Sequence, residues 1–378
     1  MKSLYKNISL IKFEIIYIAY WLRFSGFDDN WSLCKFDDLF NFQVAGDMKK
    51  ELFNEEYSDE FKYPLFANAL EKDGLLGYYK EYKYEPDSIT VTARGNVGYA
   101  TVRNERFNAV GRLIILTSKN DLNMNFFSEY INNNVKVHIE STGVPQLTAP
   151  SLKINKLHYP SLNEQNKISN FLVALNKKIG LLEKKHDQYQ NFKKYLMQQI
   201  FAQKLRFDFK NEWRQCKLKD LLTVKSSNIS INQLEDNTGE YPLYGASGFL
   251  TNIDFCEMET DYISIVKDGS GVGNLSFHEK NSSIVNTSQY LLPKKDFDIH
   301  FLYYQLQTLN LLKYVNGSSI PHIYFKDYCI EKVTVPSLPE QQKIGKLFVD
   351  TDKTLENIDN NIRVTQEFKK GLLQQMFV

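Results

Sequence analysis

Residues 160–168 read Pro-Ser-Leu-Asn-Glu-Gln-Asn-Lys-Ile, and residues 336–344 read Pro-Ser-Leu-Pro-Glu-Gln-Gln-Lys-Ile. The likeness continues without a gap, at a constant offset of 176 residues, to Gln-Gln-Ile-Phe at 198–201 and Gln-Gln-Met-Phe at 374–377. Self-similarity at a long fixed offset indicates that one structural unit occurs twice. The fold of the whole chain therefore follows from this repeat.

Each copy of the repeat predicts one long helix. Ser161 with Glu164, and Ser337 with Glu340, have the spacing of a capping box, which satisfies free N–H groups at a helix start. Apolar residues then follow a heptad pattern, so each helix carries one apolar stripe. Because such a stripe is unstable in water, we expect the two helices to pair as an antiparallel coiled coil. The stripe residues are Ile168, Leu172, Leu175, Ile179, Leu182, Tyr189, Leu196 and Ile200 in the first copy, and Ile344, Phe348, Leu355, Ile358, Ile362, Leu372 and Met376 in the second.

The repeat extends into the segments before the helices. Trp31 and Cys34 match Trp213 and Cys216 at an offset of 182, and residues 89–95 match residues 263–269 as strands that run into glycine turns. The predicted fold class is α+β: two mixed α/β domains joined by the two long helices, with pseudo-two-fold internal symmetry. The predicted order is an N-terminal extension at 1–21, a first domain at 22–159, a first helix at 160–204, a second domain at 205–335 and a second helix at 336–378.

Composition excludes several classes of protein. The formal charge is +1, and the four cysteines form no C-x-x-C pair, which argues against a zinc site or a redox pair. Residues 8–21 are too short and too charged for a membrane span. The cysteines have the character of reduced, buried thiols, so we expect a cytoplasmic protein without membrane association. No adenine-methylase motif, phosphate loop or nuclease motif is present, so we expect no catalytic residue, metal or cofactor on this chain.

The repeated motifs together resemble the specificity subunit of type I restriction–modification enzymes. These motifs are the P-S-L-x-E-Q-x-K-I helix start, the F-K-K-x-L-x-Q-Q-x-F helix end, and the L-R-F…W…C-K-x-x-D-L opening of each domain. Residues 241–248, Tyr-Pro-Leu-Tyr-Gly-Ala-Ser-Gly, also resemble a stretch of such target recognition domains, with residues 63–67 as the nearest counterpart in the first domain. The resemblance covers about residues 22–378.

This resemblance implies a DNA-reading subunit. The two domains would each read one half of a bipartite site in double-stranded DNA. Two modification subunits, which carry S-adenosylmethionine, would dock on the helices, and restriction subunits using ATP and Mg would join them. The chain itself would be non-catalytic.

Candidates for DNA contact lie in the repeat-equivalent turns, because Arg, Asn and Gln are common partners of base edges. The alternative is that the glycines of these turns mark structural hairpins with merely solvated neighbours. The domains carry local charges of −3 (22–159) and −4 (208–335), which argues against easy DNA binding by the isolated chain. The candidates are Arg94, Asn96 and Gln146 in the first domain, and Tyr244, Lys267, Ser270, Ser318, Ser319 and His322 in the second.

Charged and amide residues recur at both ends of the two helices and predict a docking surface for partner subunits. A solvated helix face is the alternative. The candidates are Glu164, Gln165, Lys193, Lys194, Gln198 and Gln199, with their equivalents Glu340, Gln341, Lys369, Lys370, Gln374 and Gln375.

Two other functions stay open at this point. The first is a coiled-coil scaffold that joins proteins without reading DNA. The second is a nucleotide enzyme that uses Gly269, Gly271 and Gly273, but the full G-x-G-x-x-G spacing is missing. A tight hairpin is favoured there, since residues 274–277 have the pattern of a returning strand.

Overall fold

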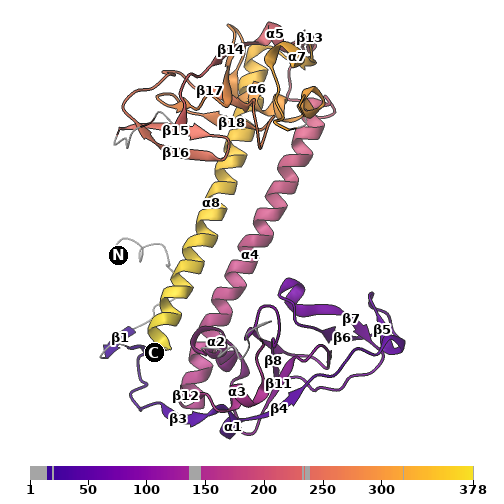
Figure 1. Cartoon of the computed structure of the whole chain (residues 1–378), viewed down its shortest axis with the longest axis vertical. Helices are drawn as coiled ribbons and strands as arrows, with labels where there is room; N and C mark the ends of the chain where they lie inside the picture. Colours follow the sequence, from indigo (N-terminus) through magenta and orange to yellow (C-terminus); the bar gives the residue numbers. More distant parts are fainter. Residues whose placement is uncertain are drawn as a thin grey trace. The chain divides into compact units, whose positions relative to one another are not determined.

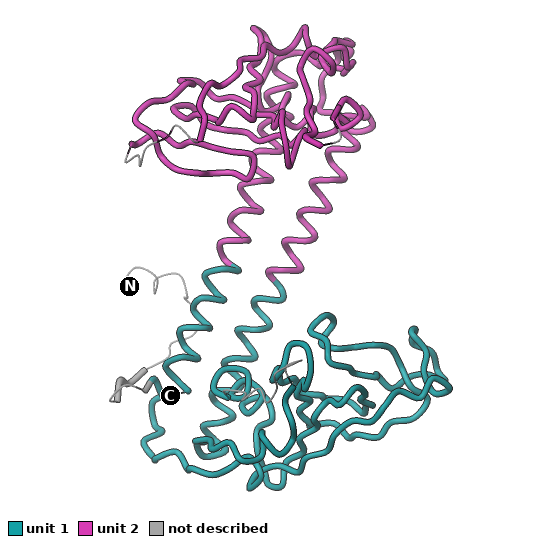
Figure 2. The backbone as a smooth tube through the Cα atoms, in the orientation of Figure 1, with its two compact units in different colours: residues 1–181, 362–378 teal, residues 182–361 magenta. Residues whose placement is uncertain are grey.

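The computed structural model describes residues 15–18, 21–135, 146–231, 234, 239–317 and 319–377. The chain forms two compact units, each built from one domain and from parts of both long helices. Unit 1 comprises residues 1–181 and 362–378, and unit 2 comprises residues 182–361 (Figure 2). The first predicted domain lies in unit 1 and the second in unit 2.

The domain of unit 1 contains two four-stranded sheets and the helix α2 (Met124–Asn134), which packs against β8 (Ser88–Val91) and β9 (Ala100–Arg103) of the first sheet (Figure 1). This first sheet has the order β4 (Phe40–Val44), β11 (Ile114–Ser118), β8, β9. The other has the order β10 (Asn108–Ala109), β6 (Tyr63–Phe66), β7 (Leu75–Tyr79), β5 (Phe53–Asn54). The remaining elements are the strand pairs β1 (Ile15–Ile18) with β2 (Trp21–Phe24) and β3 (Ser32–Lys35) with β12 (Lys156–Tyr159), and the short helices α1 (Phe36–Leu39), η2 (Lys50–Leu52), η3 (Glu71–Gly74) and α3 (Ala149–Lys153).

The domain of unit 2 repeats this topology strand for strand, apart from β1, β2 and β5. Its four-stranded sheet has the order β14 (Leu222–Ser226), β20 (Ser288–Pro293), β17 (Tyr262–Val266), β18 (Leu275–His278), and a three-stranded sheet has the order β16 (Gly248–Ile253), β15 (Tyr241–Gly245), β19 (Ser283–Ile284). The other elements are the pair β13 (Arg214–Lys217) with β21 (Lys332–Val335), and the helices α5 (Leu218–Leu221), α6 (Ile299–Gln307), η5 (Leu311–Tyr314) and α7 (Phe325–Tyr328). The sequence repeat is therefore a repeat of the fold.

The long helices α4 (Leu162–Phe201) and α8 (Leu338–Met376) supply their ends to the domain cores. In unit 1 the N-terminal residues Ile168 and Leu172 of α4 are buried with the C-terminal residues Leu372 and Met376 of α8. In unit 2 the equivalent residues are buried with the roles of the helices exchanged: Leu196 and Ile200 of α4, and Ile344 and Phe348 of α8. Burying the apolar ends of both helices in one core stabilises the joint between domain and helices.

The helices pair antiparallel, as the sequence predicts. Within unit 2, His186 Nε2 lies 3.2 Å from Asp359 Oδ1, and Lys193 Nζ lies 2.6 Å from Asp352 Oδ1. A step of seven residues forward along α4 thus corresponds to seven residues backward along α8, which is the spacing of a heptad seam. The polar residues Thr351 and Thr365, which interrupt the predicted stripe, are buried in α8.

Other sequence predictions can be checked against the elements. Each domain has one longer helix of its own, which is α2 in unit 1 and α6 in unit 2; α6 ends at Gln307 and the 3-10 helix η5 follows. Cys34 and Cys216 lie at equivalent positions of β3 and β13, and burial raises the pKa of the Cys34 thiol to about 11, which suits packing. No helix in the described part of the chain has a stretch apolar enough to span a bilayer.

Candidate functional site

The predicted turn of unit 1 lies next to the segment that carries Gln146. Arg94 and Gln146 form an antiparallel bridge, and the Leu147 amide donates to the Ala93 carbonyl at 3.0 Å. Arg94 and Asn96 are exposed, whereas Gln146 is partly exposed. The structure therefore brings all three predicted residues of the first domain to one surface.

The second domain repeats this arrangement. Asp268, at the repeat-equivalent position of Arg94, bridges to His322. The Gly269 amide donates to the Pro321 carbonyl at 2.9 Å, and the Ile323 amide donates to the Lys267 carbonyl at 2.8 Å. Two segments far apart in sequence thus lie side by side and carry the exposed Ser270 and Ser319 together with the partly exposed Lys267 and His322. Ser318, the remaining candidate of this loop, lies outside the described residues.

Two of the candidates in unit 2 have contacts within the domain. Lys267 Nζ lies 3.1 Å from Asp268 Oδ2, so its charge is partly balanced. Tyr244 lies apart from the other candidates of the second domain. Its ring lies 4.3 Å from the His278 ring and packs against the cluster that contains Tyr262. Tyr262 is at the start of β17, whereas Lys267 follows the end of that strand.

The glycine cluster of unit 2 forms a hairpin. β17 pairs antiparallel with β18, and the residues between them include three glycines with positive φ: Gly269 (83°), Gly271 (83°) and Gly273 (87°). A strand follows this turn, whereas a dinucleotide-binding turn needs a helix there. The hairpin prediction is confirmed, and the nucleotide-enzyme hypothesis loses its only motif.

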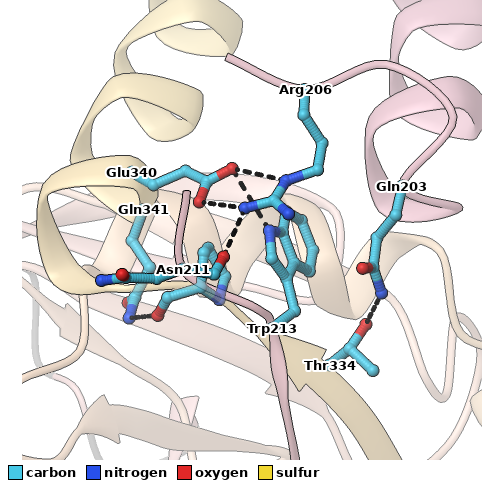
Figure 3. A network of polar contacts seen from close by, with 8 residues as sticks. Gln203, Arg206, Asn211, Trp213, Thr334, Glu340 and Gln341 are labelled. Atoms are coloured by element: carbon cyan, nitrogen blue, oxygen red, sulfur yellow. Dashed lines mark hydrogen bonds and ion pairs between the residues drawn. The ribbon is translucent and has the colours of Figure 1, made fainter. Parts of the chain in front are cut away.

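Both long helices are anchored to their domains by a buried carboxylate and an arginine. In unit 2, Glu340 Oε1 accepts from Arg206 Nε at 3.2 Å and Glu340 Oε2 accepts from Arg206 Nη2 at 2.9 Å, while Trp213 Nε1 donates to Oε1 at 3.2 Å (Figure 3). In unit 1, Glu164 Oε1 and Oε2 accept from Arg23 Nε and Nη2 at 2.8 Å and 2.6 Å. This fork-to-fork pairing is the strong geometry for an arginine and a carboxylate.

The glutamines that follow these glutamates are buried as well. Gln341 Nε2 donates to the Pro336 carbonyl at 3.0 Å, and its Oε1 accepts from the Asp298 amide, the N-cap residue of α6. In unit 1, Gln165 Nε2 donates to the Pro160 carbonyl, and Gln165 Oε1 accepts from the amide of Asn123, the N-cap residue of α2. All four of the predicted docking residues Glu164, Gln165, Glu340 and Gln341 are thus at most 1% exposed and bind within their own unit, which argues against direct contact with a partner subunit.

Lys193 and Lys369 have intramolecular partners too. In unit 1, Lys369 Nζ of α8 lies 2.9 Å from Glu129 Oε1 of α2, and this same oxygen accepts from Asn176 Nδ2 of α4 at 2.9 Å. In unit 2, Lys193 of α4 pairs with Asp352 of α8, and Asp352 Oδ2 accepts from the Tyr304 hydroxyl of α6 at 2.7 Å. We call these the three-residue latches, 176–129–369 and 352–304–193, because each joins both long helices to the domain helix. The two lysines are therefore half-buried latch residues and do not form a free docking surface.

The other predicted docking residues remain accessible. Lys194 and Gln198 are exposed in unit 2, as are their equivalents Lys370 and Gln374 in unit 1; Gln375 is exposed and Gln199 partly so. Lys194 and Gln198 also line a groove of about 750 Å³ between α4 and α6, with Met197, Phe201 and Leu355 as its apolar wall. A groove with apolar walls and a basic rim is suited to a protein partner.

The intramolecular partners of the buried glutamates and of the latch lysines were not predicted from the sequence. Arg23 and Arg206 recur in the Leu-Arg-Phe motif, and that repeat of a charged residue was the available signal. The latch residues Glu129 and Tyr304 carry no such signal, because the residue type is not repeated. The carboxylate of the latch lies on α2 in unit 1 (Glu129) and on α8 in unit 2 (Asp352).

The comparisons with known proteins agree with the doubled fold. A family model described as the type I restriction modification DNA specificity domain matches the chain twice, at residues 28–190 and 210–366. The chain belongs to the type I restriction–modification DNA specificity family. Each match of the family model covers most of one domain and reaches into the following long helix, as the repeat in sequence requires.

Proteins named as type I specificity subunits are similar to this chain in sequence. A protein of Mycoplasma pneumoniae named as a type I specificity subunit is 30% identical over 47% of this chain and 51% of its own length. The chain thus spans about half the length of that relative. A protein of Mycoplasma genitalium, also named as a type I specificity subunit, is 23% identical over 92% of this chain and 94% of its own length. The crystal structure of a type I S subunit from M. genitalium has a TM-score of 0.71 at 20% identity and covers 93% of this chain and 97% of that one, which shows the shared fold.

Proposed function

We propose that this chain is the DNA sequence-specificity subunit of a type I restriction–modification complex. The observation that carries this proposal is the doubled turn: the bridge of Arg94 with Gln146 and the bridge of Asp268 with His322 occupy equivalent positions of two domains with the same topology. Two copies of one reading surface with different side chains suit a bipartite site with two different halves.

The residues of these turns fit contacts with base edges and backbone. Arg94, Asn96 and Gln146 would read the first half-site, since Arg pairs with guanine and Asn or Gln with adenine. Lys267, Ser270, Ser319 and His322, with Ser318, would contact the second. Tyr244 is half-buried beside His278, so its role would be to support the domain.

The chain would contribute recognition and no chemistry. S-adenosylmethionine, ATP and Mg would belong to the modification and restriction subunits of the complex. The repeated and exposed pairs Lys194 with Lys370 and Gln198 with Gln374 would give two equivalent docking places, and therefore two modification subunits for each chain.

The experiment is a comparison of methylated sites in host DNA with and without this gene. We expect one bipartite adenine-methylation motif to disappear when the gene is deleted and to return when it is restored. A scaffold without DNA readout, the alternative function, would leave the sequence of the methylated sites unchanged in both cases. Restoring the gene with Arg94→Ala should relax one base position of the motif, at a cost of about 1–3 kcal/mol in binding.

A further inference from the structure

Arg103, the last residue of β9 in unit 1, is a buried cation on which the carboxylates of Asp73 and Glu105 act through charge interaction. Its side chain is 6% exposed. Nε donates to Thr90 Oγ1 at 2.9 Å, Nη2 donates to the Asp73 carbonyl at 2.8 Å, and the guanidinium carbon lies 3.6 Å from the centroid of the Phe66 ring. Among the described residues, no carboxylate forms an ion pair with it. A buried charge of this kind normally has a counter-ion.

This arginine forms part of the wall of an open hollow of about 510 Å³. Lys62 and Lys72 are exposed at the same hollow, as are the carboxylates of Asp73 and Glu105, so three cations face two acids. Burial lowers the pKa of Arg103 to about 10, which leaves the group protonated at neutral pH. The charged residues of the hollow thus sum to a net charge of +1, and this excess corresponds to the buried Arg103.

The backbone beside the hollow is held in an unfavourable conformation. Lys72, Asp73 and Gly74 have consecutive positive φ angles of 49°, 54° and 83°. A Cβ atom at position 74 would lie 2.8 Å from the Ala67 carbonyl oxygen, so only glycine fits there. This turn aims the Asp73 carbonyl at Arg103, and such outliers often mark functional sites.

Unit 2 has a different residue at the equivalent position. Arg103 pairs with Ser88 in the sheet, as His278 pairs with Tyr262, and the Thr90 hydroxyl has its counterpart in Ser264, whose Oγ lies 2.9 Å from His278 Nε2. His278 lies between the Tyr244 and Tyr262 rings, and burial lowers its pKa to about 4, so it is neutral. At this position, the buried cation of unit 1 is therefore replaced by a neutral histidine in unit 2.

We propose that the hollow above Arg103 binds a phosphate group, with Lys62 and Lys72 as further donors. Nε and Nη2 of Arg103 already donate within the domain, which leaves Nη1 as the donor toward a phosphate oxygen, and the two flexible lysines can reach the remaining oxygens. If the proposed function holds, this phosphate belongs to the DNA backbone beside the first half-site. A free phosphate or nucleotide is the other source of the same chemistry.

The test uses the full chain and three variants. Lys62→Gln with Lys72→Gln removes the exposed donors, Arg103→His copies the residue of unit 2, and Lys49→Gln with Lys50→Gln removes two exposed lysines of unit 1 outside the hollow. One measurement is the salt dependence of binding to a duplex DNA. The other is the change in melting temperature when inorganic phosphate replaces chloride at equal ionic strength.

We expect the Lys62/Lys72 variant to lower the magnitude of the salt slope by about 1, because the two lysines serve one phosphate and each lost phosphate contact removes about 0.9. The control should leave the slope unchanged, and phosphate should stabilise the wild type and the control only.

Should Arg103→His fail to fold, the two-lysine variant still decides between these outcomes. Phosphate stabilisation with an unchanged DNA slope would assign the hollow to a free anion. No effect on either measurement would overturn the proposal. A wild type that binds no duplex would refute the proposed function, and the melting experiment would still decide on the anion site.

Discussion

Single residues show how the two halves of this chain keep one structure with different chemistry. Arg23 with Glu164 and Arg206 with Glu340 are identical pairs at equivalent positions, and both fix a helix start to its domain. The latches keep their positions but exchange their charges: the carboxylate is on the domain helix in unit 1 (Glu129) and on the long helix in unit 2 (Asp352). The positions of the latch residues are therefore the same in both units, whereas the residue types at these positions differ.

The latch makes a prediction on stability. Glu129→Gln should destabilise unit 1 by about 1–2 kcal/mol, because it leaves half-buried Lys369 without its counter-charge. Adding Asn176→Asp should restore at least half of this loss, because residue 176 is equivalent to Asp352, which binds the lysine in unit 2. Chemical unfolding of both variants measures this, with Glu183→Gln as a control on the exposed face of α4. A double variant no more stable than Glu129→Gln alone would contradict the equivalence.

His278 makes unit 2 sensitive to acid. Burial lowers its pKa from 6.5 to about 4, so the unfolded chain binds a proton at a higher pH than the folded chain does. His278 therefore does not change the free energy of unfolding above pH 6.5. This free energy falls as the pH decreases from 6.5 to 4, and below pH 4 it is lower by about 3 kcal/mol. Thermal unfolding across this range should show a steeper loss in the wild type than in His278→Gln. Equal slopes would mean that His278 is not buried in its neutral form.

At the scale of elements, α4 and α8 bind the domains with their ends, and the middle of α4 is less covered. The ends are buried in the domain cores, whereas Leu175, Ile179 and Leu182 are only partly buried. An apolar stripe that two helices do not cover completely is a place where a partner can pack.

Helix length should set the distance between the half-sites. An insertion of four residues near Lys184 and another near Asn360 would lengthen each helix by about 6 Å. We expect the spacer of the methylated motif to grow by nearly two base pairs, at about 3.4 Å for each step. Both half-sites should stay unchanged, which sequencing of methylated DNA would show. An unchanged spacer in an assembled complex would refute this role of the helices.

The sequence predicted these elements because the information for them is local and repeated. Heptads specify the helices, and glycines followed by alternating residues specify the hairpins at Gly95 and Gly269. The burial of Glu164 and Gln165 could not be predicted in this way, since their partners Arg23 and Asn123 lie far away in the sequence. The pocket of Arg103 was missed for the same reason: its walls come from β6, β9 and a turn with positive φ.

At the scale of the whole molecule, the repeat predicts the number of partners. Two equivalent docking places should bind two modification subunits. The single variants Lys194→Glu and Lys370→Glu should each bind one modification subunit. The double variant should bind none, because each substitution reverses a charge on the proposed docking surface. Lys184→Glu is the matched control, since it is exposed on α4 and has no lysine at its repeat-equivalent position. Native mass spectrometry counts the subunits. A wild type that binds one partner even with the partner in excess would contradict the two-place account.

Independent reading by two domains is the central claim, and one measurement tests it most directly. Residues 208–335 are exchanged for the equivalent segment of a relative, and methylated sites are sequenced in a host that carries the partner subunits. We predict that one half of the bipartite motif changes while the other half and the spacer stay the same. A change in both halves together would contradict the account, because the two domains would then not read DNA independently.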